Sequence, residues 1–172
     1  MRDQLTTFRT PLGWCAMLGQ GDRLRALTFG YRSGQAAIAR LNQDLIAEAP
    51  LSSWNRRLAK RIAAMLDGAM DEFTDVEVDL DHLTPFARHV AEACRQIPWG
   101  ETLSYGQLAT IAGRAGAARA VGRVMSQNRT PLVVPCHRVI ASGGQLGGFS
   151  APQGIKLKQR LLALESAAIC VG

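Results

Sequence analysis

A cysteine, a histidine and an arginine are adjacent at Cys136-His137-Arg138, directly after Pro135 and the apolar run 132–134. A deprotonated cysteine is a nucleophile, and cationic or imidazole neighbours usually lower its pKa from about 8.5 towards neutrality. Pro135 fixes its own φ and favours an extended preceding residue, so a strand that ends in a rigid loop is expected here. The three residues are either a reactive cysteine beside its base or a buried structural cysteine with polar neighbours.

Glycine-rich sequence follows over 142–144 and 147–150. Glycine lets a backbone approach a flat ligand closely, so this loop is a candidate ligand-binding segment. The cysteines form no C-x-x-C pair, and their spacing fits neither a disulfide framework nor a zinc site. We therefore expect reduced thiols and no metal. The four cysteines are Cys15, Cys94, Cys136 and Cys170.

The sequence has 172 residues, of which 47% are hydrophobic and 20% charged, as in a globular protein with one large domain or two small ones. No apolar run approaches the roughly 18 residues of a membrane span, and no apolar signal core follows the N-terminus, so a cytoplasmic protein without membrane contact is expected. Residues 84–172 hold ten Lys and Arg against three Asp and Glu, whereas residues 1–83 hold ten against eleven. The basic half favours a polyanionic partner such as nucleic acid.

Hydrophobic periodicity predicts a small α/β unit in the N-terminal part. A glycine-containing turn separates two apolar runs, which is typical of a hairpin. The acidic run 67–81 is the expected joint to a second domain. The expected elements are strands over 14–18 and 24–29, a helix capped by Ser33 that extends to about Ala47, a helix over 54–66, and a half-exposed strand over 76–80.

The C-terminal part is predicted to be mostly helical, with helices over 85–95, from Ser104 through Ile111, and over 117–127. The last two are joined by a glycine-containing turn, which is typical of a helix-turn-helix. Arg119 and Arg123 lie on one face of the last helix. Its small residues Ala120 and Gly122 suit either close approach to a DNA groove or tight helix packing. The expected fold is an α/β N-terminal domain over 1–80 and a mostly α-helical domain with a helix-turn-helix over 81–172.

These motifs together resemble the O6-alkylguanine–DNA alkyltransferases, also called methylated-DNA–protein-cysteine methyltransferases. The resemblance covers about residues 84–166, whereas the N-terminal part matches mainly through 10–13. It implies a ribonuclease-H-like fold for residues 1–80, and a monomer that binds double-stranded DNA carrying O6-alkylguanine in the minor groove without a cofactor. The matching residues are Pro85-Phe86, 97–102, 104–109, 117–122, Asn128, 135–140 and 161–165.

The resemblance also implies roles for single residues. Cys136 would accept the methyl or alkyl group from O6 of guanine, with O4 of thymine as a second target. His137 would draw the thiol proton through a water, and Glu165 would orient its ring. Asn128 resembles the hinge between the helix-turn-helix and the acceptor segment. Tyr105 resembles the tyrosine that crowds the target phosphate and donates to the extruded base.

Other residues resemble the family's DNA contacts. Arg119 resembles the arginine that enters the duplex where the guanine has left. Ser150 and backbone groups of Cys136 and Val139 would contact the extruded base. A base must leave the stack before a protein sulfur can reach it, and the resulting thioether is not activated for hydrolysis, so each molecule is expected to act once. The remaining expected contacts are Ala120, Gly122, Arg123, Arg138 and Phe149.

Two other classes of function are open from the residues. One is a non-catalytic relative that binds alkylated DNA, but such relatives lack the cysteine. The other is a helix-turn-helix transcription regulator, which would bind a specific sequence and need a dimer interface. The sequence also departs from the family pattern: Phe149 stands where tyrosine is common, and the segment 150–154 is longer than usual, which bears on the position of Ser150.

Overall fold

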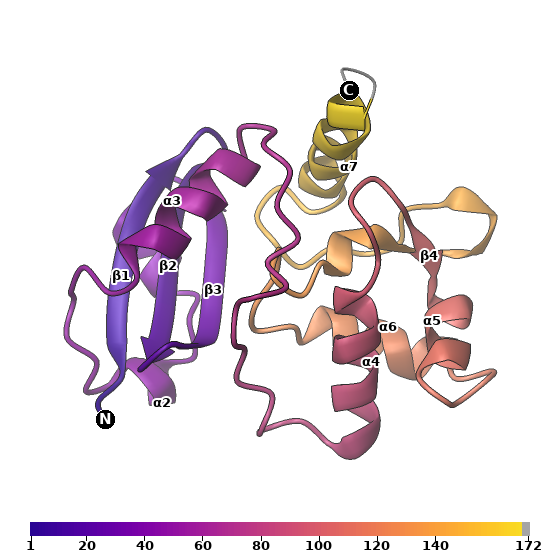
Figure 1. The fold of residues 1–172 in the computed structure, drawn as a ribbon, viewed down its shortest axis with the longest axis horizontal. Coiled ribbons are helices and arrows are strands. Elements are labelled where there is room, and N and C mark those ends of the chain that lie inside the picture. Colours follow the sequence, from indigo (N-terminus) through magenta and orange to yellow (C-terminus); the bar gives the residue numbers. More distant parts are fainter. Residues whose placement is uncertain (170–172) are drawn as a thin grey trace.

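The computed structural model describes residues 1–169 and contains a three-stranded antiparallel sheet and a helical part beside it (Figure 1). Strands β1 (Gln4–Thr10), β2 (Gly13–Gln20) and β3 (Arg23–Tyr31) follow one another in the sheet in chain order. The hairpin of β2 and β3 confirms the prediction. The sequence analysis missed β1, because its Leu5 and Phe8 are three residues apart and do not alternate.

Apolar side chains cover both faces of the sheet. One face packs on α3 (Arg56–Met65), which buries Leu58, Ile62 and Met65 as its predicted amphipathic pattern requires. The other face, with Leu18 and Ala26, packs on α1 (Gly34–Ile38). The sheet is therefore held rigidly between two layers, which fixes the position of β3.

Two predicted N-terminal elements are wrong. The expected helix from Ser33 to Ala47 is split into α1 and α2 (Gln43–Ile46), although Ser33 does cap α1. Asn42 caps the backbone of α2, and the Gln43 side chain donates to the carbonyls of Ala39 and Leu41, so local side-chain bonds replace helical ones.

The predicted strand over 76–80 is an extended segment that forms only an isolated bridge between Leu24 and Val78. It belongs to the long linker that carries the chain from the sheet to the helical part (Figure 1). Arg61 on α3 pairs with Asp71 and Asp75 of this linker at 2.7 Å each.

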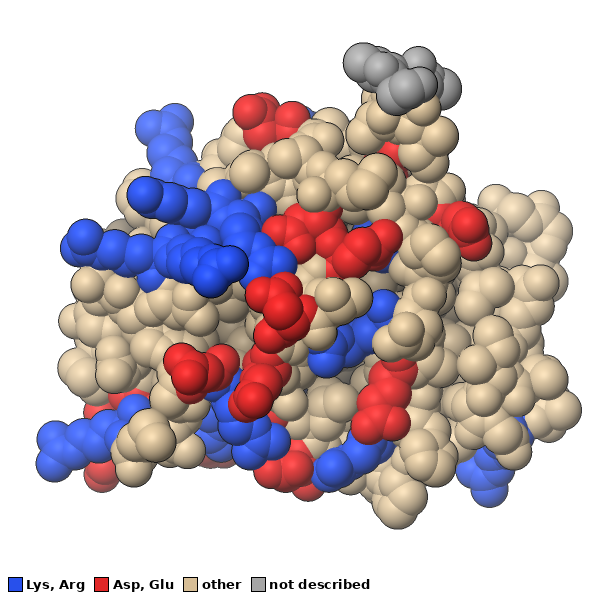
Figure 2. Space-filling model, in the orientation of Figure 1, with Lys and Arg blue, Asp and Glu red and all other residues tan. Residues whose placement is uncertain are grey.

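Figure 2 shows basic side chains gathered over the N-terminal part beside an acidic band, so that the N-terminal part also has a basic face.

The predicted helices of the C-terminal part are confirmed as α4 (Pro85–Arg95), α5 (Tyr105–Ile111) and α6 (Ala118–Ser126). Thr84 caps α4, and Ser104 forms a reciprocal capping box with Gln107 at the start of α5. The three helices enclose a second core, and the turn between α5 and α6 has positive φ at Gly113 and Gly116. That α5 and α6 act as a DNA-binding helix-turn-helix stays a prediction.

Residues 131–144, which include Cys136 and are called here the acceptor segment after its predicted role, lie between α6 and the last helix, α7 (Ile155–Ile169). The apolar run 132–134 was expected to be a strand, but Leu132 has a φ of 72° and the run forms a tight buried turn. After it come the 3-10 helix η1 (Cys136–Arg138), the short strand β5 (Val139–Ile140), which pairs parallel with β4 (Leu103–Ser104), and the turn η2 (Ser142–Gly144).

Helix α7 packs through Leu157 and Leu161 on the core that also contains Leu27 and Phe29 of β3. The two parts of the chain therefore share apolar contacts beside the acceptor segment, and a boundary at residue 80 stays a prediction. No helix within residues 1–169 is long and apolar enough to cross a membrane.

Candidate active site

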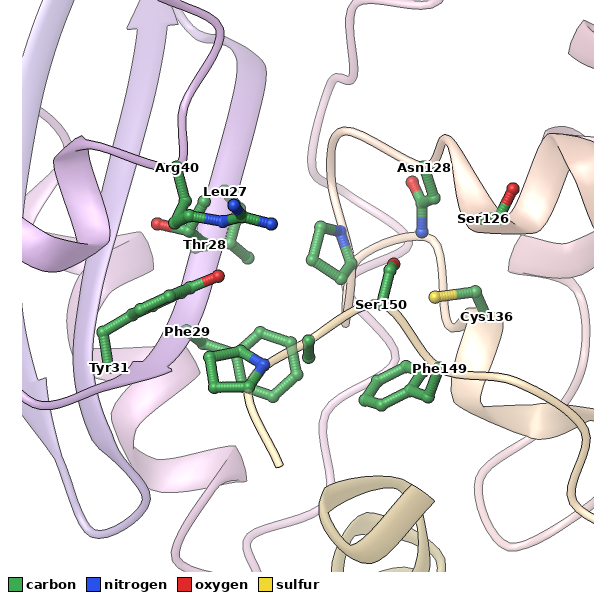
Figure 3. A pocket seen from close by; sticks show the side chains of 13 residues that line it. Leu27, Thr28, Phe29, Tyr31, Arg40, Ser126, Asn128, Cys136, Phe149 and Ser150 are labelled. Atoms are coloured by element: carbon green, nitrogen blue, oxygen red, sulfur yellow. The ribbon is translucent and has the colours of Figure 1, made fainter. Parts of the chain in front are cut away.

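Cys136 begins η1 and is only 8% exposed, yet it lines two cavities, one of which is drawn in Figure 3. The first, of about 210 Å³, extends towards β3 and is called here the sheet-side cavity. The second, of about 500 Å³, extends towards α5 and α6 and is called the helix-side cavity. Phe149 and Ser150 line both, so Ser150 lies beside Cys136 despite the longer segment that follows it. The helix-side cavity is lined by Tyr105, Gly122, Met125, Ser126, Cys136, Gly148, Phe149 and Ser150.

His137 and Glu165 form a fully buried pair behind Cys136. The distance from His137 Nε2 to Glu165 Oε1 is 2.7 Å. Burial opposes ionisation of Glu165, but hydrogen bonds from His137 and Arg138 outweigh it and lower its pKa from 4.5 to about 2. Burial lowers the pKa of His137 despite the nearby carboxylate, so the imidazole is neutral near pH 7.

The hydrogen bonding of this pair fixes the imidazole tautomer. An ionised carboxylate can only accept, so His137 Nε2 carries the proton and Nδ1 has a free lone pair. Nδ1 is buried and finds no hydrogen-bond partner among residues 1–169. The histidine therefore has one basic nitrogen available to receive a proton, as the predicted role requires.

Arg138 does not have the role that was expected for it. Its side chain is 2% exposed, so a direct contact with DNA is excluded in this structure. Its Nε and Nη2 donate to Glu165 at 3.0–3.1 Å, and its Nη1 donates to Glu72 at 3.0 Å and to the Ile97 carbonyl at 2.6 Å. Arg138 instead holds Glu165 in place and in its ionised form.

The sequence analysis missed the residues that complete this buried network. Glu72, in the linker, accepts from Arg138 and from the backbone amide of Trp99. Gly100 donates its amide to Glu165 Oε2 at 3.1 Å, and the Trp99 indole donates to the backbone carbonyl of Glu165. Glu72 lies 66 residues before Arg138, and no local pattern connects the two.

The pKa of Cys136 is raised, whereas the sequence analysis expected it to be lowered. Burial is the largest cause, and it outweighs the hydrogen bond to Asn128 and the charge of Lys158. Arg138 points away to Glu165, and His137 is neutral, so neither supplies the expected positive charge. In this structure Cys136 is a thiol at neutral pH, and a base must take its proton before it can attack carbon.

Lys158 is a second residue that sequence reasoning missed. It is fully buried on α7, and its Nζ donates to the Val139 carbonyl at 2.6 Å. The Val139 carbonyl keeps a second lone pair beside this bond, so the expected contact of its backbone with an extruded base stays a prediction. A lysine between Leu157 and Leu161, on the face of α7 that the apolar pattern predicts to be buried, was the signal that could have indicated it.

Asn128 lies between the end of α6 and the acceptor segment. Its Nδ2 donates to the Val134 carbonyl at 2.8 Å, and its Oδ1 accepts from the Thr130 amide at 3.1 Å. The side chain thus joins the two segments that the hinge prediction named. Tyr105, on the opposite wall of the helix-side cavity, is half-buried over Gly147, where a Cβ would lie 2.8 Å from its hydroxyl.

The remaining predicted DNA contacts lie outside both cavities beside Cys136. Arg119, Ala120 and Arg123 line a separate groove between α6 and the start of α4, together with Phe86 and Arg129. The structure therefore brings the residues predicted as acceptor, base, hinge and loop contacts together, and separates them from the arginines of α6. Both arginines are exposed.

Comparisons with known proteins agree with this geometry. Residues 85–167 match the sequence family described as 6-O-methylguanine DNA methyltransferase, DNA binding domain. The structure is similar to that of Mycobacterium tuberculosis OGT in complex with DNA, with a TM-score of 0.80 and 32% identity over 96% of this chain and 94% of that one. It is also similar to the O6-methylguanine-DNA methyltransferase of Pyrococcus kodakaraensis, with a TM-score of 0.70 and 26% identity over 94% of this chain and 99% of that one.

Curated relatives give the same family. A methylated-DNA–protein-cysteine methyltransferase of Salmonella typhimurium is 38% identical over 165 residues, which cover 91% of each protein. One of Mycolicibacterium paratuberculosis is 46% identical over 106 residues, and that match spans 62% of its length. The chain belongs to the methylated-DNA–protein-cysteine methyltransferase family.

Proposed function

We propose that the protein repairs DNA by irreversible transfer of a methyl or larger alkyl group from O6 of guanine, or O4 of thymine, to Cys136. The observation that carries the proposal is the position of Cys136 at the junction of two cavities, with the buried His137–Glu165 pair behind it. The names of the relatives support the same chemistry for the family.

The transfer is a direct displacement at carbon. The Cys136 thiol gives its proton towards His137 Nδ1, through a bridging water, and Glu165 stabilises the imidazolium that forms. The sulfur attacks the alkyl carbon as the carbon–O6 bond breaks, and the electron pair of that bond stays on the guanine. The base takes up one proton at N1, which balances the proton lost by the thiol. The product thioether is stable, so each molecule acts once.

Access to the target requires an extruded nucleotide. Rotation out of the duplex costs a few kcal/mol, and a side chain inserted into the gap offsets part of that cost. We assign this role to Arg119, with Ala120 and Gly122 allowing α6 to approach the minor groove closely. The exposed Arg123 would contact the DNA backbone, and the base would enter the helix-side cavity between Tyr105, Phe149 and Ser150. The protein is proposed to act as a cytoplasmic monomer.

Intact-mass analysis after incubation with a duplex that carries O6-methylguanine tests the proposal. We expect one added methyl group per protein molecule, mapped to Cys136 by peptide analysis, and no further turnover. Cys136→Ala should abolish the mass change, whereas Cys94→Ala, at a buried thiol away from both cavities, should retain it. An unchanged protein mass, continued turnover, or a methyl group on another cysteine would refute the proposal.

A transcription regulator of this fold would give a different result. It would bind one DNA sequence strongly without being alkylated, whereas a repair protein that contacts phosphates binds with little sequence preference and loses affinity steeply with salt. Binding of several unrelated duplexes at two salt concentrations separates the two functions.

A further inference from the structure

The sheet-side cavity is larger than a methyl group needs. A cavity of about 150 Å³ is enough to hold benzene, and the sheet-side cavity measures about 210 Å³. In an in-line displacement, sulfur, carbon and O6 lie on one axis, so the rest of an alkyl group must extend sideways from that axis. If the base occupies the helix-side cavity, as proposed above, the sheet-side cavity is the space left for the chain of a longer adduct.

The sheet-side cavity changes character along its length. Near Cys136 it is lined by Asn128 and Ser150, and apolar side chains, Leu27 and Pro131 among them, also line it. Its far end, on the N-terminal sheet, is polar: Figure 3 shows the Arg40 guanidinium and the Tyr31 hydroxyl turned into the cavity from the side opposite Cys136. Its lining residues are Leu27, Thr28, Phe29, Tyr31, Arg40, Ser126, Asn128, Pro131, Cys136 and 149–152.

The positive charge at this far end is not neutralised by the protein. No acidic residue lines the cavity. Within residues 1–169, the Arg40 guanidinium makes no ion pair or hydrogen bond, unlike Arg25, Arg61 and Arg138, which are all paired with carboxylates. A guanidinium presents a planar set of donors that suits a carboxylate, and such charge-assisted hydrogen bonds are stronger than neutral ones.

Under the proposed function the chain of a larger alkyl group would occupy the sheet-side cavity. We propose that Arg40 and Tyr31 bind an anionic group, such as a carboxylate, at the end of that chain. The inference rests on the proposed function, because it concerns the alkyl group that is transferred to Cys136. The transfer step itself is the same: the carbon–sulfur bond forms as the carbon–O6 bond breaks, and the carboxylate is carried over unchanged.

The test compares carboxylate and amide adducts of equal length. Duplexes carry O6-methylguanine, O6-carboxyalkylguanines of increasing chain length, or the matching carboxamides, and the single-turnover rate of protein alkylation is measured by intact mass. At the chain length that reaches Arg40, we expect the carboxylate to react about fivefold faster than its amide, a moderate factor because Arg40 is exposed. Arg40→Gln should reduce the ratio to about one, Arg40→Lys should keep part of it, and Tyr31→Phe should lower it.

Arg32→Gln is the matched control. Arg32 is exposed, lies next to Tyr31 in the sequence and does not line the cavity, and its loss changes the net charge by the same amount. It should leave the carboxylate-to-amide ratio unchanged. Neither arginine variant should alter the rate with O6-methylguanine, because the methyl group does not reach the far end of the cavity.

Several results would overturn the inference. One is a ratio near one at every chain length in the wild-type protein; another is an equal effect of Arg32→Gln and Arg40→Gln. If Arg40→Gln slowed methyl and carboxylate transfer equally from duplexes, and left free carboxyalkylguanine base unaffected, Arg40 would bind a DNA phosphate instead. Methyl transfer without a carboxylate preference would refute only this inference, whereas absence of methyl transfer would refute the proposed function and the inference with it.

Discussion

Substitution of Glu165 by glutamine removes one negative charge from the buried network and keeps the size of the side chain nearly unchanged. The carboxylate accepts hydrogen bonds from His137, Arg138 and the Gly100 amide. Glutamine keeps the shape but replaces one acceptor oxygen with a donor, which then faces the donors of His137 and Arg138. The Arg138 guanidinium is left with Glu72 and the Ile97 carbonyl as its partners.

The magnitude follows from the pKa of Glu165. Its fall from 4.5 to about 2, at about 1.4 kcal/mol for each pKa unit, corresponds to about 3 kcal/mol of folding free energy. Breaking one side of a buried pair costs about 3–5 kcal/mol, which agrees. For a chain of this length, 1 kcal/mol lowers the Tm by about 2–4 °C, so Glu165→Gln should lower it by roughly 6–12 °C at pH 7.

The effect should also depend on pH. The pKa of Glu165 is lower in the folded than in the unfolded protein, so its contribution is fully present above pH 4.5 and is lost as the pH falls towards 2. Thermal unfolding of both proteins at pH 7, 4.5 and 3 should show a Tm difference that shrinks at the lowest pH. Methyl transfer should slow by about tenfold or more at pH 7, because the His137 ring loses its orientation and the charge that supports imidazolium.

Glu72→Gln is the control for this experiment. It removes a carboxylate from the same arginine, but Glu72 does not touch His137, and its side chain is 35% exposed. We expect a smaller fall in Tm and a transfer rate near that of the wild type. The reasoning is refuted if Glu165→Gln changes the Tm by less than 2 °C (below the roughly 6 °C minimum worked out above), or if both variants slow transfer equally.

Three further predictions concern the acceptor, the DNA contact and a helix cap. Because burial raises the pKa of Cys136, iodoacetamide should label it more slowly at pH 7 than it labels free cysteine, and faster as the pH rises; rapid labelling at pH 7, read by peptide mass, would contradict this. Arg119→Ala should slow repair of duplex DNA by about tenfold or more while leaving reaction with free O6-alkylguanine base unchanged, because only the duplex requires base extrusion; equal losses would show that Arg119 does not enter the duplex. Ser104→Ala removes the cap of α5 and should lower the free energy of unfolding by about 1 kcal/mol. Ser166→Ala, at an exposed hydroxyl that bonds within α7, is the control and should have little effect on the Tm. Similar Tm shifts for both variants would refute the capping role.

The helices of the C-terminal part were predictable because their signals are local. Thr84 with Pro85, and Ser104 with Gln107, mark helix starts within four residues of sequence. The helix over 33–47 and the strand over 76–80 were wrong, because side-chain bonds around Asn42 and the sparse pairing of the linker override the apolar pattern. Local signals therefore gave the framework of the site but not its N-terminal surroundings.

The positions of the candidate site residues were predictable from the sequence, whereas their electrostatics were not. Cys136, His137 and Glu165 lie together as expected. The ionised state of Glu165 depends on hydrogen bonds from His137 and from Arg138, and Arg138 also bonds to Glu72, 66 residues away in sequence. The raised pKa of Cys136 depends on burial by segments that sequence alone does not bring together. Such long-range contacts have no signature in a single sequence.

The wall of the sheet-side cavity has a consequence for how this protein can evolve. Leu27, Thr28 and Tyr31 belong to β3, outside the residues 85–167 that match the family and carry the acceptor, its base and its orienting carboxylate. If this cavity holds the alkyl chain as proposed, substitutions on this edge strand would change which lesions fit without any change to Cys136, His137 or Glu165. Selection by new mutagens could act on that strand alone, leaving the reaction it serves untouched.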